Sequence, residues 1–499
     1  MENNKEIKNK TITGLFWRFG ERITAQLISF VVSMVLARIL MPEEYGLVSL
    51  VTIFITLANV FTTNGLGTAL IQKKEADKLD FSTMFWAGII VSFILYIILF
   101  ICAPIIASAY NNSTLELIIR VMGLKIPIAA INSIQQAYVS RKMIYKKFFF
   151  STFFGTLVSA IVGIYMAVKN FGVWALVAQY LTNSCIDTVV LFITIDWRPT
   201  LQFSIERFKK MFSFGWKVMV TSFIGTFFDQ LRGLLIGINY KSEDLAYYNK
   251  GEQIPALVGN NINSTIESVL FPAMSKVQDS KEDIKNATRR VMKTNTYIVM
   301  PMMFGLAAIA SPLIKILLTD KWIECVPFLQ IVCMQQCVGI MGSANLQAIK
   351  AIGKSDVLLK LEMIKKPIYL IILLISMQIG PIAIALGNLI YNIIAIAINA
   401  IPNKKFLRYS YIEQLKDVKW NFLLSASMFL LVYIVGKCNF NIYINIILQI
   451  LVGSVYYVFM SYILKNESLT YIKNSIKGII SNKKGEKNED SKENIKMGL

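Results

Sequence analysis

Apolar residues in this chain come in long uninterrupted blocks, which are separated by short segments rich in charged and turn-forming residues. A stretch of roughly 20 apolar residues is long enough for a helix to cross a bilayer. About fourteen such blocks lie near 12–38, 46–69, 82–109, 115–137, 149–168, 172–194, 214–238, 246–271, 294–318, 325–349, 357–378, 381–400, 420–436 and 441–464. The connections are too short to fold as separate soluble domains. The pattern therefore predicts an all-α polytopic membrane protein with about fourteen transmembrane helices.

Two pairs of similar segments indicate an internal duplication. ILMPEEYGLVSL leads into the second block and INYKSEDLAYYNK into the eighth, with Glu43 and Glu243 200 residues apart. FGVWALVAQYL opens the sixth block and IGPIAIALGNLI opens the twelfth. Because six spans separate the copies, both enter the membrane from the same side, as parallel repeats do. The duplication predicts two six-helix bundles around a central cavity, followed by two extra C-terminal helices.

The predicted organisation has five parts. They are a cytoplasmic N-terminus (1–11), an N-terminal six-helix bundle (12–200), a C-terminal six-helix bundle (201–403), helices 13 and 14 (404–464) and a cytoplasmic tail (465–499). The tail is charged and lacks a hydrophobic period, which predicts disorder.

The distribution of charge predicts how the chain crosses the membrane. The net charge is +20, and if the N-terminus is inside, the inner segments hold 35 of the 51 Lys and Arg residues, whereas the outer loops hold four. This asymmetry follows the positive-inside rule and predicts that both termini are cytoplasmic. The positive charge is thus explained by topology, and no nucleic-acid partner is expected.

Composition argues against an enzyme or a metalloprotein. The chain is 55% hydrophobic with a mean hydropathy of +0.54, and it has six cysteines, no C-x-x-C pair and no histidine. No metal site or cofactor is expected from this set, and a coupled proton would need a carboxylate. The segment AIKAIGKS resembles a phosphate-binding loop, but Ala348 replaces its first glycine. We therefore expect a transport protein without catalytic residues.

Polar residues interrupt four of the blocks at helical spacing. The first block carries Gly14, Arg18, Arg22, Gln26, Ser29 and Ser33, and the seventh carries Lys217, Thr221, Gly225, Asp229 and Arg232. Weaker stripes are Asn59, Thr63 and Gly67 on the second block, and Asn260, Ser264 and Glu267 on the eighth. A charge at mid-bilayer costs at least about 2.5–3.5 kcal/mol. We therefore expect the four stripes to face a shared polar cavity between the two halves.

A structural interpretation of the same residues stays open. Arg18 and Arg22 lie near the inner end of their block, where long side chains reach the headgroups. Glu21 is three residues from Arg18, at a spacing that favours an ion pair along the helix. Asp229 and Arg232 have the same spacing and the same alternative. Lys125, in the fourth block, is a further cavity candidate.

Five segments together resemble the polysaccharide flippase family of the multidrug/oligosaccharidyl-lipid/polysaccharide exporter superfamily. In order they are VLARILMPEEYGLVSLVTIF, NGLGTALIQKK, FGVWALVAQYL, FSFGWKVM and LFPAMSKVQDSKEDIKNATRRVMK, and the resemblance covers roughly residues 12–465. It implies two six-helix bundles around a cavity lined by spans 1, 2, 7 and 8. It also implies export of undecaprenyl-diphosphate-linked oligosaccharides across the bacterial inner membrane by alternating access.

The resemblance also implies a cationic cavity that holds the diphosphate. The positions that fit it are Arg18, Arg22, Lys217 and Arg232, with Lys125 as a further candidate. Amide side chains suit sugar hydroxyls, and Gln26, Asn59 and Asn260 are available. Candidates for coupling to an ion are Glu21, Asp229 and Glu267. Expected partners are the lipid-linked oligosaccharide diphosphate, membrane lipids, a polysaccharide polymerase and glycosyltransferases, and the transporter is expected to be monomeric.

The alternative function is a cation-coupled multidrug exporter of the same superfamily, which would share the twofold architecture. Such a protein would be expected to offer carboxylates to cationic substrates. The stripes of this chain carry more Lys and Arg than Asp and Glu, which favours an anionic substrate.

Overall fold

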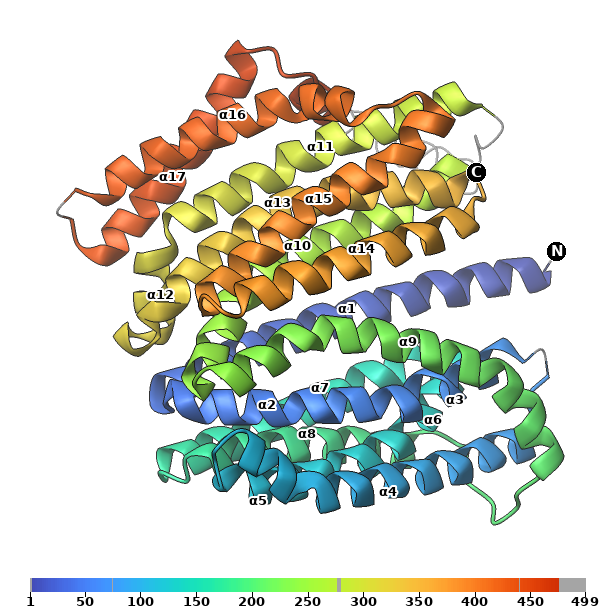
Figure 1. The fold of residues 1–499 in the computed structure, drawn as a ribbon. Helices are drawn as coiled ribbons and strands as arrows, with labels where there is room; N and C mark the ends of the chain where they lie inside the picture. Colours follow the sequence, from blue (N-terminus) through green and yellow to red (C-terminus); the bar gives the residue numbers. More distant parts are fainter. Residues whose placement is uncertain (1, 74, 276–279, 439, 475–499) are drawn as a thin grey trace, which may run out of the picture. The chain divides into compact units, whose positions relative to one another are not determined.

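The computed structural model describes residues 2–73, 75–275, 280–438 and 440–474, and every regular element in these ranges is a helix (Figure 1). The first part of the chain contains α1 (Glu2–Ile39), α2 (Pro42–Asn59), the π-helix η1 (Val60–Asn64), α3 (Leu66–Gln72), α4 (Lys78–Ala109), α5 (Thr114–Gly123), α6 (Lys125–Lys142), α7 (Tyr145–Val168), α8 (Val173–Thr194) and α9 (Ile205–Asn239). The second part contains α10 (Ser242–Ser275), α11 (Lys281–Ala308), α12 (Ala310–Leu318), the 3-10 helix η2 (Asp320–Cys325), α13 (Val326–Ala351), α14 (Ser355–Ser376), α15 (Pro381–Leu407), α16 (Tyr411–Gly436) and α17 (Ile442–Ile463). The predicted all-α polytopic class is confirmed.

Each predicted apolar block falls on one helix or on consecutive helices, and the block 46–69 covers three of them, α2, η1 and α3. In the described residues, 11 helical segments are long and apolar enough to span a membrane, or up to 12 if α11 and α12, which meet at a 70° bend, form one span. The helix α14 does not qualify because Lys360, Glu362, Lys365 and Lys366 fall within about two of its turns. The helix α10 does not qualify either, and it contains three asparagines near its middle. The count of fourteen spans stays a prediction.

The helices form two compact units. The first comprises Met1–Tyr247 with Leu317–Lys321, and the second comprises the rest of the described chain. The helix α9 packs against α2, η1, α3 and α4, which places it in the first unit. The predicted boundary between the bundles at residue 200 therefore differs from the division by packing, because the sequence repeat does not record which helices α9 contacts.

The predicted tail also differs in its first residues. Residues 467–474 are helical, and they are held to α11 by the ion pair between Lys293 Nζ and Glu467 Oε2, at 2.7 Å. Arg290 lies over the ring of Tyr471, with 5.3 Å between the guanidinium carbon and the ring centroid. Residues 475–499 lie outside the described residues.

The two copies of the repeat begin their second helix with the same hydrogen bond. In α2 the Glu44 carboxylate accepts a hydrogen bond from the backbone N–H of Met41, at 2.7 Å. In α10 the Asp244 carboxylate accepts one from the backbone N–H of Lys241, at 3.1 Å. An acidic residue at the third helical position satisfies a free N–H and suits the positive end of the helix dipole. The spacing of 200 residues noted in the sequence is therefore matched in local structure.

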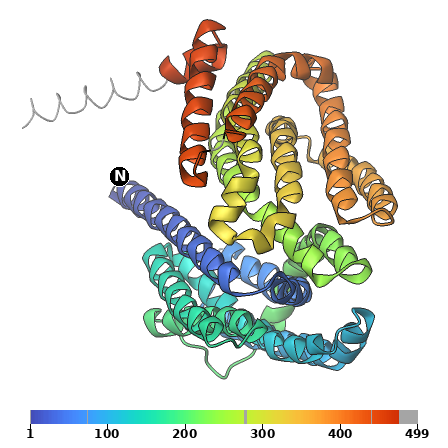
Figure 2. The ribbon, with the colours of Figure 1, turned by 90° about the vertical axis from the view of Figure 1, so that its left-hand side faces the viewer.

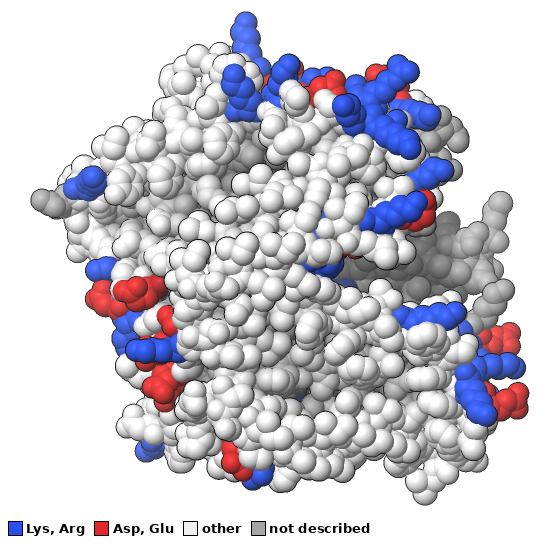
Figure 3. All heavy atoms as spheres, in the orientation of Figure 1, with Lys and Arg blue, Asp and Glu red and all other residues white. Residues whose placement is uncertain are grey.

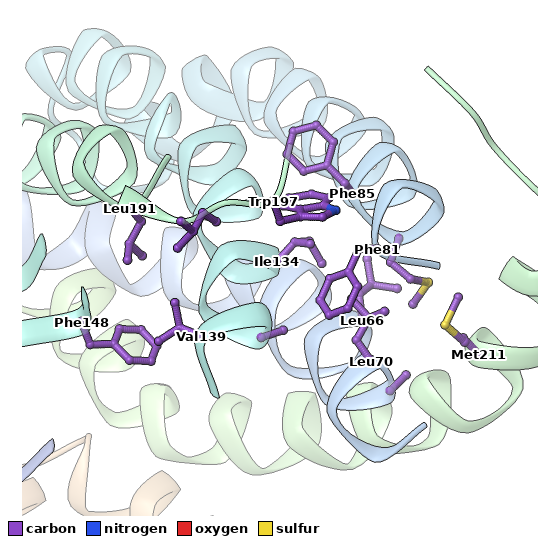
Figure 4. Close-up of a cluster of buried hydrophobic side chains, with 14 residues drawn as sticks. Leu66, Leu70, Phe81, Phe85, Ile134, Val139, Phe148, Leu191, Trp197 and Met211 are labelled. Atoms are coloured by element: carbon purple, nitrogen blue, oxygen red, sulfur yellow. The ribbon is translucent and has the colours of Figure 1, made fainter. Parts of the chain in front are cut away.

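An aromatic core holds the helices of the first unit together (Figure 4). Trp197, in the connection after α8, lies 5.8 Å from both Phe81 and Phe85 of α4, measured between ring centroids. All three side chains are at most 5% exposed. Burial of such rings contributes about 1.5–3 kcal/mol each. This core fixes the connection between α8 and α9, and so fixes where α9 begins.

Charge is distributed along the helices as expected for membrane spans. On the face drawn in Figure 3, Lys, Arg, Asp and Glu side chains of each unit gather toward the ends of its helices. A wide uncharged surface lies between them. Such a surface matches the hydrocarbon core of a bilayer, which is about 30 Å thick.

Candidate functional site

The first predicted stripe lies on α1, which packs along α7 (Figure 2). Trp17 of α1 contacts Phe149 of α7 edge to face, with 5.3 Å between the ring centroids. Arg18 places its guanidinium carbon 4.8 Å from the centroid of Phe148. These aromatic contacts hold the first turns of this span on α7. Within the stripe, Arg18, Arg22 and Ser29 are exposed, whereas Gly14 is buried.

Arg18 and Glu21 form the ion pair that the sequence spacing allowed. Arg18 Nη1 lies 3.0 Å from Glu21 Oε2, and the two side chains are 53% and 13% exposed. Arg22 is exposed and Gln26 is half-buried. The ion pair holds the Arg18 guanidinium along α1. About half of the Arg18 side chain stays exposed, so the pair is compatible with binding of a substrate by Arg18.

The second stripe lies on α9. Lys217, Thr221 and Asp229 are exposed, and Arg232 is half-buried. The helix is held by a close contact between backbones, because a Cβ on Gly215 would lie 2.9 Å from the carbonyl oxygen of Gly65. The helix α1 packs on α7, whereas α9 packs on α2, η1, α3 and α4. The structure therefore places both stripes in one unit, on helices that pack against different neighbours.

The third stripe begins where α2 changes into the π-helix η1. The Asn59 carbonyl accepts hydrogen bonds from the hydroxyls of Thr62 and Thr63, at 3.1 and 2.7 Å. A π-helical turn within a longer helix is rare and is often found at functional sites. Thr63 and Gly67 line a pocket whose wall consists of residues of the first unit. Gly67 lets α3 pack closely on α6, since a Cβ there would lie 3.3 Å from Ser133 Oγ.

The remaining candidates lie apart from these stripes. Lys125 begins α6 and places its ammonium 5.1 Å from the ring centroid of Tyr180, on α8. Asn260 is an exposed residue of α10 in the second unit. The side chain of Glu267 lies outside the described residues. The structure therefore groups Lys125 with the interior of the first unit and not with Arg18 and Arg22.

Sequence reasoning missed a polar pocket of about 350 Å³ in the first unit. Its lining comes from η1 and α3, α6 and α8, and includes Thr63, Gly67, Asn132, Ser133, Asn183, Asp187 and Thr188. The signal was Asp187 itself, an isolated carboxylate within an apolar block, since such residues are functional candidates by default. Asp187 does not belong to a polar stripe along its own helix, because its polar neighbours lie on other helices.

Comparisons with known proteins show what this chain is similar to. A family model described as polysaccharide biosynthesis protein matches residues 35–327. The chain is 24% identical over 439 residues to the lipopolysaccharide biosynthesis protein WzxC of Escherichia coli (strain K12), covering 86% of this chain and 88% of that protein. It is also 24% identical over 356 residues to the succinoglycan biosynthesis transport protein ExoT of Rhizobium meliloti (strain 1021), covering 70% and 72% of the two chains.

A solved structure shares the fold. Lipid II flippase MurJ, in an inward closed conformation, superposes with a TM-score of 0.71 over 92% of this chain and 100% of that chain. The sequence identity is 16%, so this similarity concerns the arrangement of the helices and not the substrate.

Proposed function

Because the chain belongs to the polysaccharide biosynthesis protein family, we propose that it moves an oligosaccharide linked to undecaprenyl diphosphate from the inner to the outer leaflet of the bacterial inner membrane. The names of WzxC and ExoT refer to lipopolysaccharide biosynthesis and to transport in succinoglycan biosynthesis. MurJ, which shares the fold, is named a lipid II flippase. The names of WzxC and ExoT support a sugar-containing substrate, MurJ supports only the fold, and the diphosphate lipid link is part of the proposal.

The observation that carries the proposal is the exposure of cations within predicted membrane spans. Arg18 and Arg22 on α1 and Lys217 on α9 are exposed, although both helices qualify as membrane spans. A diphosphate that crosses the bilayer loses water, and an unpaired ion in a low dielectric costs tens of kcal/mol. Guanidinium groups replace that water because their planar fork donates paired hydrogen bonds to phosphate oxygens.

Transport also requires release of the substrate, so the transporter must bind the diphosphate with only moderate affinity. Glu21 shares the Arg18 guanidinium and competes with phosphate for it. In the proposed alternating-access cycle, the sugar and diphosphate pass through the transporter while the polyprenyl chain stays in lipid. Gln26, Asn59 and Asn260 offer amides to the sugar hydroxyls. No bond is made or broken in this cycle, so no catalytic residue is assigned.

The membrane potential supplies part of the driving force. An inside-negative potential favours outward movement of an anion by about 2.3 kcal/mol per charge per 100 mV. The proposed orientation has both termini in the cytoplasm, where glycosyltransferases would complete the oligosaccharide. A polymerase on the outer side would then consume it. The transporter is proposed to act as a monomer.

The test uses a host that lacks its own polysaccharide flippase and cannot export the polymer. Wild-type protein should restore export, and Arg22→Ala should lower it by about tenfold, since a hydrogen bond to a charged group contributes about 1.5–3 kcal/mol. Lys210→Ala is the matched control, because Lys210 is 82% exposed and its ion pair with Glu206 spans 3.9 Å. Unchanged export by Arg22→Ala at equal membrane abundance would contradict the proposed role of the cations.

A further inference from the structure

The pocket inside the first unit surrounds a single carboxylate. Asp187 of α8 accepts a hydrogen bond at Oδ2 from Asn132 Nδ2 of α6, at 2.7 Å. The same amide nitrogen lies 3.2 Å from Thr188 Oγ1. On the α7 side the backbone is close, since a Cβ on Gly155 would lie 3.3 Å from Asp187 Cβ. The carboxylate therefore lies where α6, α7 and α8 meet.

Two oxygen atoms of this group have no hydrogen-bond partner. Both Asp187 Oδ1 and Asn132 Oδ1 are buried without a hydrogen bond in the described residues. Asn132 is 7% exposed and lines the pocket. A buried polar atom without a partner costs about 1–3 kcal/mol. Both atoms are acceptors. The Ser151 hydroxyl of α7 also lies near Asp187, but it donates its hydrogen to the carbonyl of Phe148, so the two oxygens still lack a donor.

No cation of the described residues neutralises Asp187 in this pocket. The residues that line it contain no Lys, Arg or second carboxylate. Lys125 and Arg141, near the two ends of α6, contact other groups. Lys125 lies over the Tyr180 ring, and Arg141 donates to the backbone carbonyls of Leu70, Ile71 and Lys73. On α7, the facing residues are Gly155 and Ser151, which carry no charge.

We propose that Asp187 is a protonation site that couples transport to the proton gradient. A proton from solvent forms an O–H bond at Oδ1, the carboxylate becomes neutral, and the new hydroxyl supplies the missing donor. The pocket opens to the surface of the first unit at Thr68 and Gln136, which also line it and are exposed, and we take this opening as the route of the proton. The reverse step returns the proton to water, so charge and atoms balance without another reactant.

The protonation state changes how the helices are joined. A hydrogen bond to an ionised carboxylate is roughly twice as strong as a neutral one, so protonation weakens the bond from Asn132 Nδ2 and at the same time adds a donor at Oδ1, which changes the link between α6 and α8. The pocket wall includes Thr63, whose hydroxyl donates to the carbonyl of Asn59. The pocket thus adjoins the polar stripe of the second span. The coupling role rests on the proposed transport function, whereas protonation of Asp187 does not.

The first test measures protonation without transport. Purified full-length protein in proteoliposomes is acidified, and the carbonyl stretch of protonated carboxyl groups is recorded by infrared difference spectroscopy. We expect a band that Asp187→Asn removes and that Asp196→Asn keeps, because Asp196 is an 89% exposed carboxylate at the end of α8. Asn is isosteric with Asp and still accepts a hydrogen bond, so the variant preserves the packing. A band unchanged in Asp187→Asn would overturn the proposal.

The second test measures the coupling. In the flippase-null host, Asp187→Asn should lower export at least tenfold at equal abundance, and Asp187→Glu should restore part of it. If Asp187→Asn exports like wild type, the coupling role fails even where the infrared band is present. If wild type gives the band but exports no polymer, the proposed function fails and the protonation site stands. A third outcome concerns sodium ions. If NaCl raises the unfolding temperature more than choline chloride does, if Asp187→Asn abolishes this difference, and if the infrared band is absent, then Asp187 binds an alkali cation and the protonation proposal is overturned.

Discussion

Arg207, in the first turn of α9, forms an ion pair with Asp77, the N-cap residue of α4, with 2.6 Å between Arg207 Nη1 and Asp77 Oδ2. The same guanidinium nitrogen lies 3.2 Å from Asp80 Oδ1, and the Asp80 side chain is 1% exposed. Lys73 Nζ approaches Asp80 from the other side, at 2.6 Å. This group of charges joins the beginning of α9 to the beginning of α4 and thus helps to position the helix that carries Lys217.

Asp77 predicts an acid-sensitive contribution to stability. The hydrogen bond from Arg207 lowers the pKa of Asp77 from 3.8 to about 2. A carboxyl group whose pKa is lower in the folded state stabilises the folded protein, and this contribution is complete at pH values above the ordinary pKa of the group. It is lost as the pH falls from about 3.8 through about 2. The side chains of Arg207 and Asp77 are 36% and 56% exposed, so solvent limits the contribution to less than about 1 kcal/mol.

We therefore expect Asp77→Asn to lower the free energy of unfolding in detergent slightly at pH 7, and we expect this effect to disappear as the pH falls below about 2. The variant keeps an oxygen that accepts the hydrogen bond from the backbone N–H of Asp80, so the helix cap is preserved. Glu206→Gln is the control, because its pair with Lys210 is longer and more than 80% exposed. An equal loss at both pH values would show that the charge is not responsible.

The contact between Gly65 and Gly215 predicts a strong effect of one methyl group. A Cβ on Gly215 would lie 2.9 Å from the Gly65 carbonyl oxygen, and backbone cannot move aside as a flexible side chain can. Gly215→Ala should destabilise the protein by about 1–3 kcal/mol, measured as a lower unfolding temperature in detergent. Gly225→Ala, on the same helix with no atom within 4 Å of its Cβ, should be neutral or slightly stabilising. Equal unfolding temperatures for the two variants would contradict this packing.

The proposed topology predicts which engineered cysteines react from outside. In a background without the six native cysteines, Glu43→Cys should react with a membrane-impermeant maleimide in intact spheroplasts. Glu206→Cys should react only after permeabilisation. Both side chains are exposed in the structure, so reactivity reports on the side of the membrane. The opposite pattern would mean that the termini are outside.

The elements themselves could be predicted well because each depends on local sequence. Apolar blocks of the right length marked the helices, and the family predicted from five segments is confirmed by the match over residues 35–327. The Arg18–Glu21 pair was foreseen as an alternative because three residues along a helix bring side chains together. The polarity of α14, in contrast, was underestimated, since a block was defined by its apolar residues and not by the charges within it.

The polar pocket could not be predicted because its residues come from separate helices. Asn132 and Asp187 are 55 residues apart and meet only when α6 packs on α8. Arg207 and Asp77 are 130 residues apart and meet through the packing of α9 on α4. A periodic stripe shows which residues share a face of one helix, but it does not show which neighbour that face contacts. For this reason the stripe with Thr63 and Gly67 could be recognised, whereas the side chains of α6 and α8 that line the same pocket could not.

The central claim is that the cations of α1 carry the diphosphate through the membrane. The most direct measurement is the rate at which purified protein moves a lipid-linked oligosaccharide between the leaflets of proteoliposomes, scored by the accessibility of its sugar to an added glycosidase. The account predicts that the double variant Arg18→Ala, Arg22→Ala is at least tenfold slower than wild type and that Lys210→Ala is unchanged. A double variant that moves the oligosaccharide as fast as wild type, at the same protein content, would contradict it.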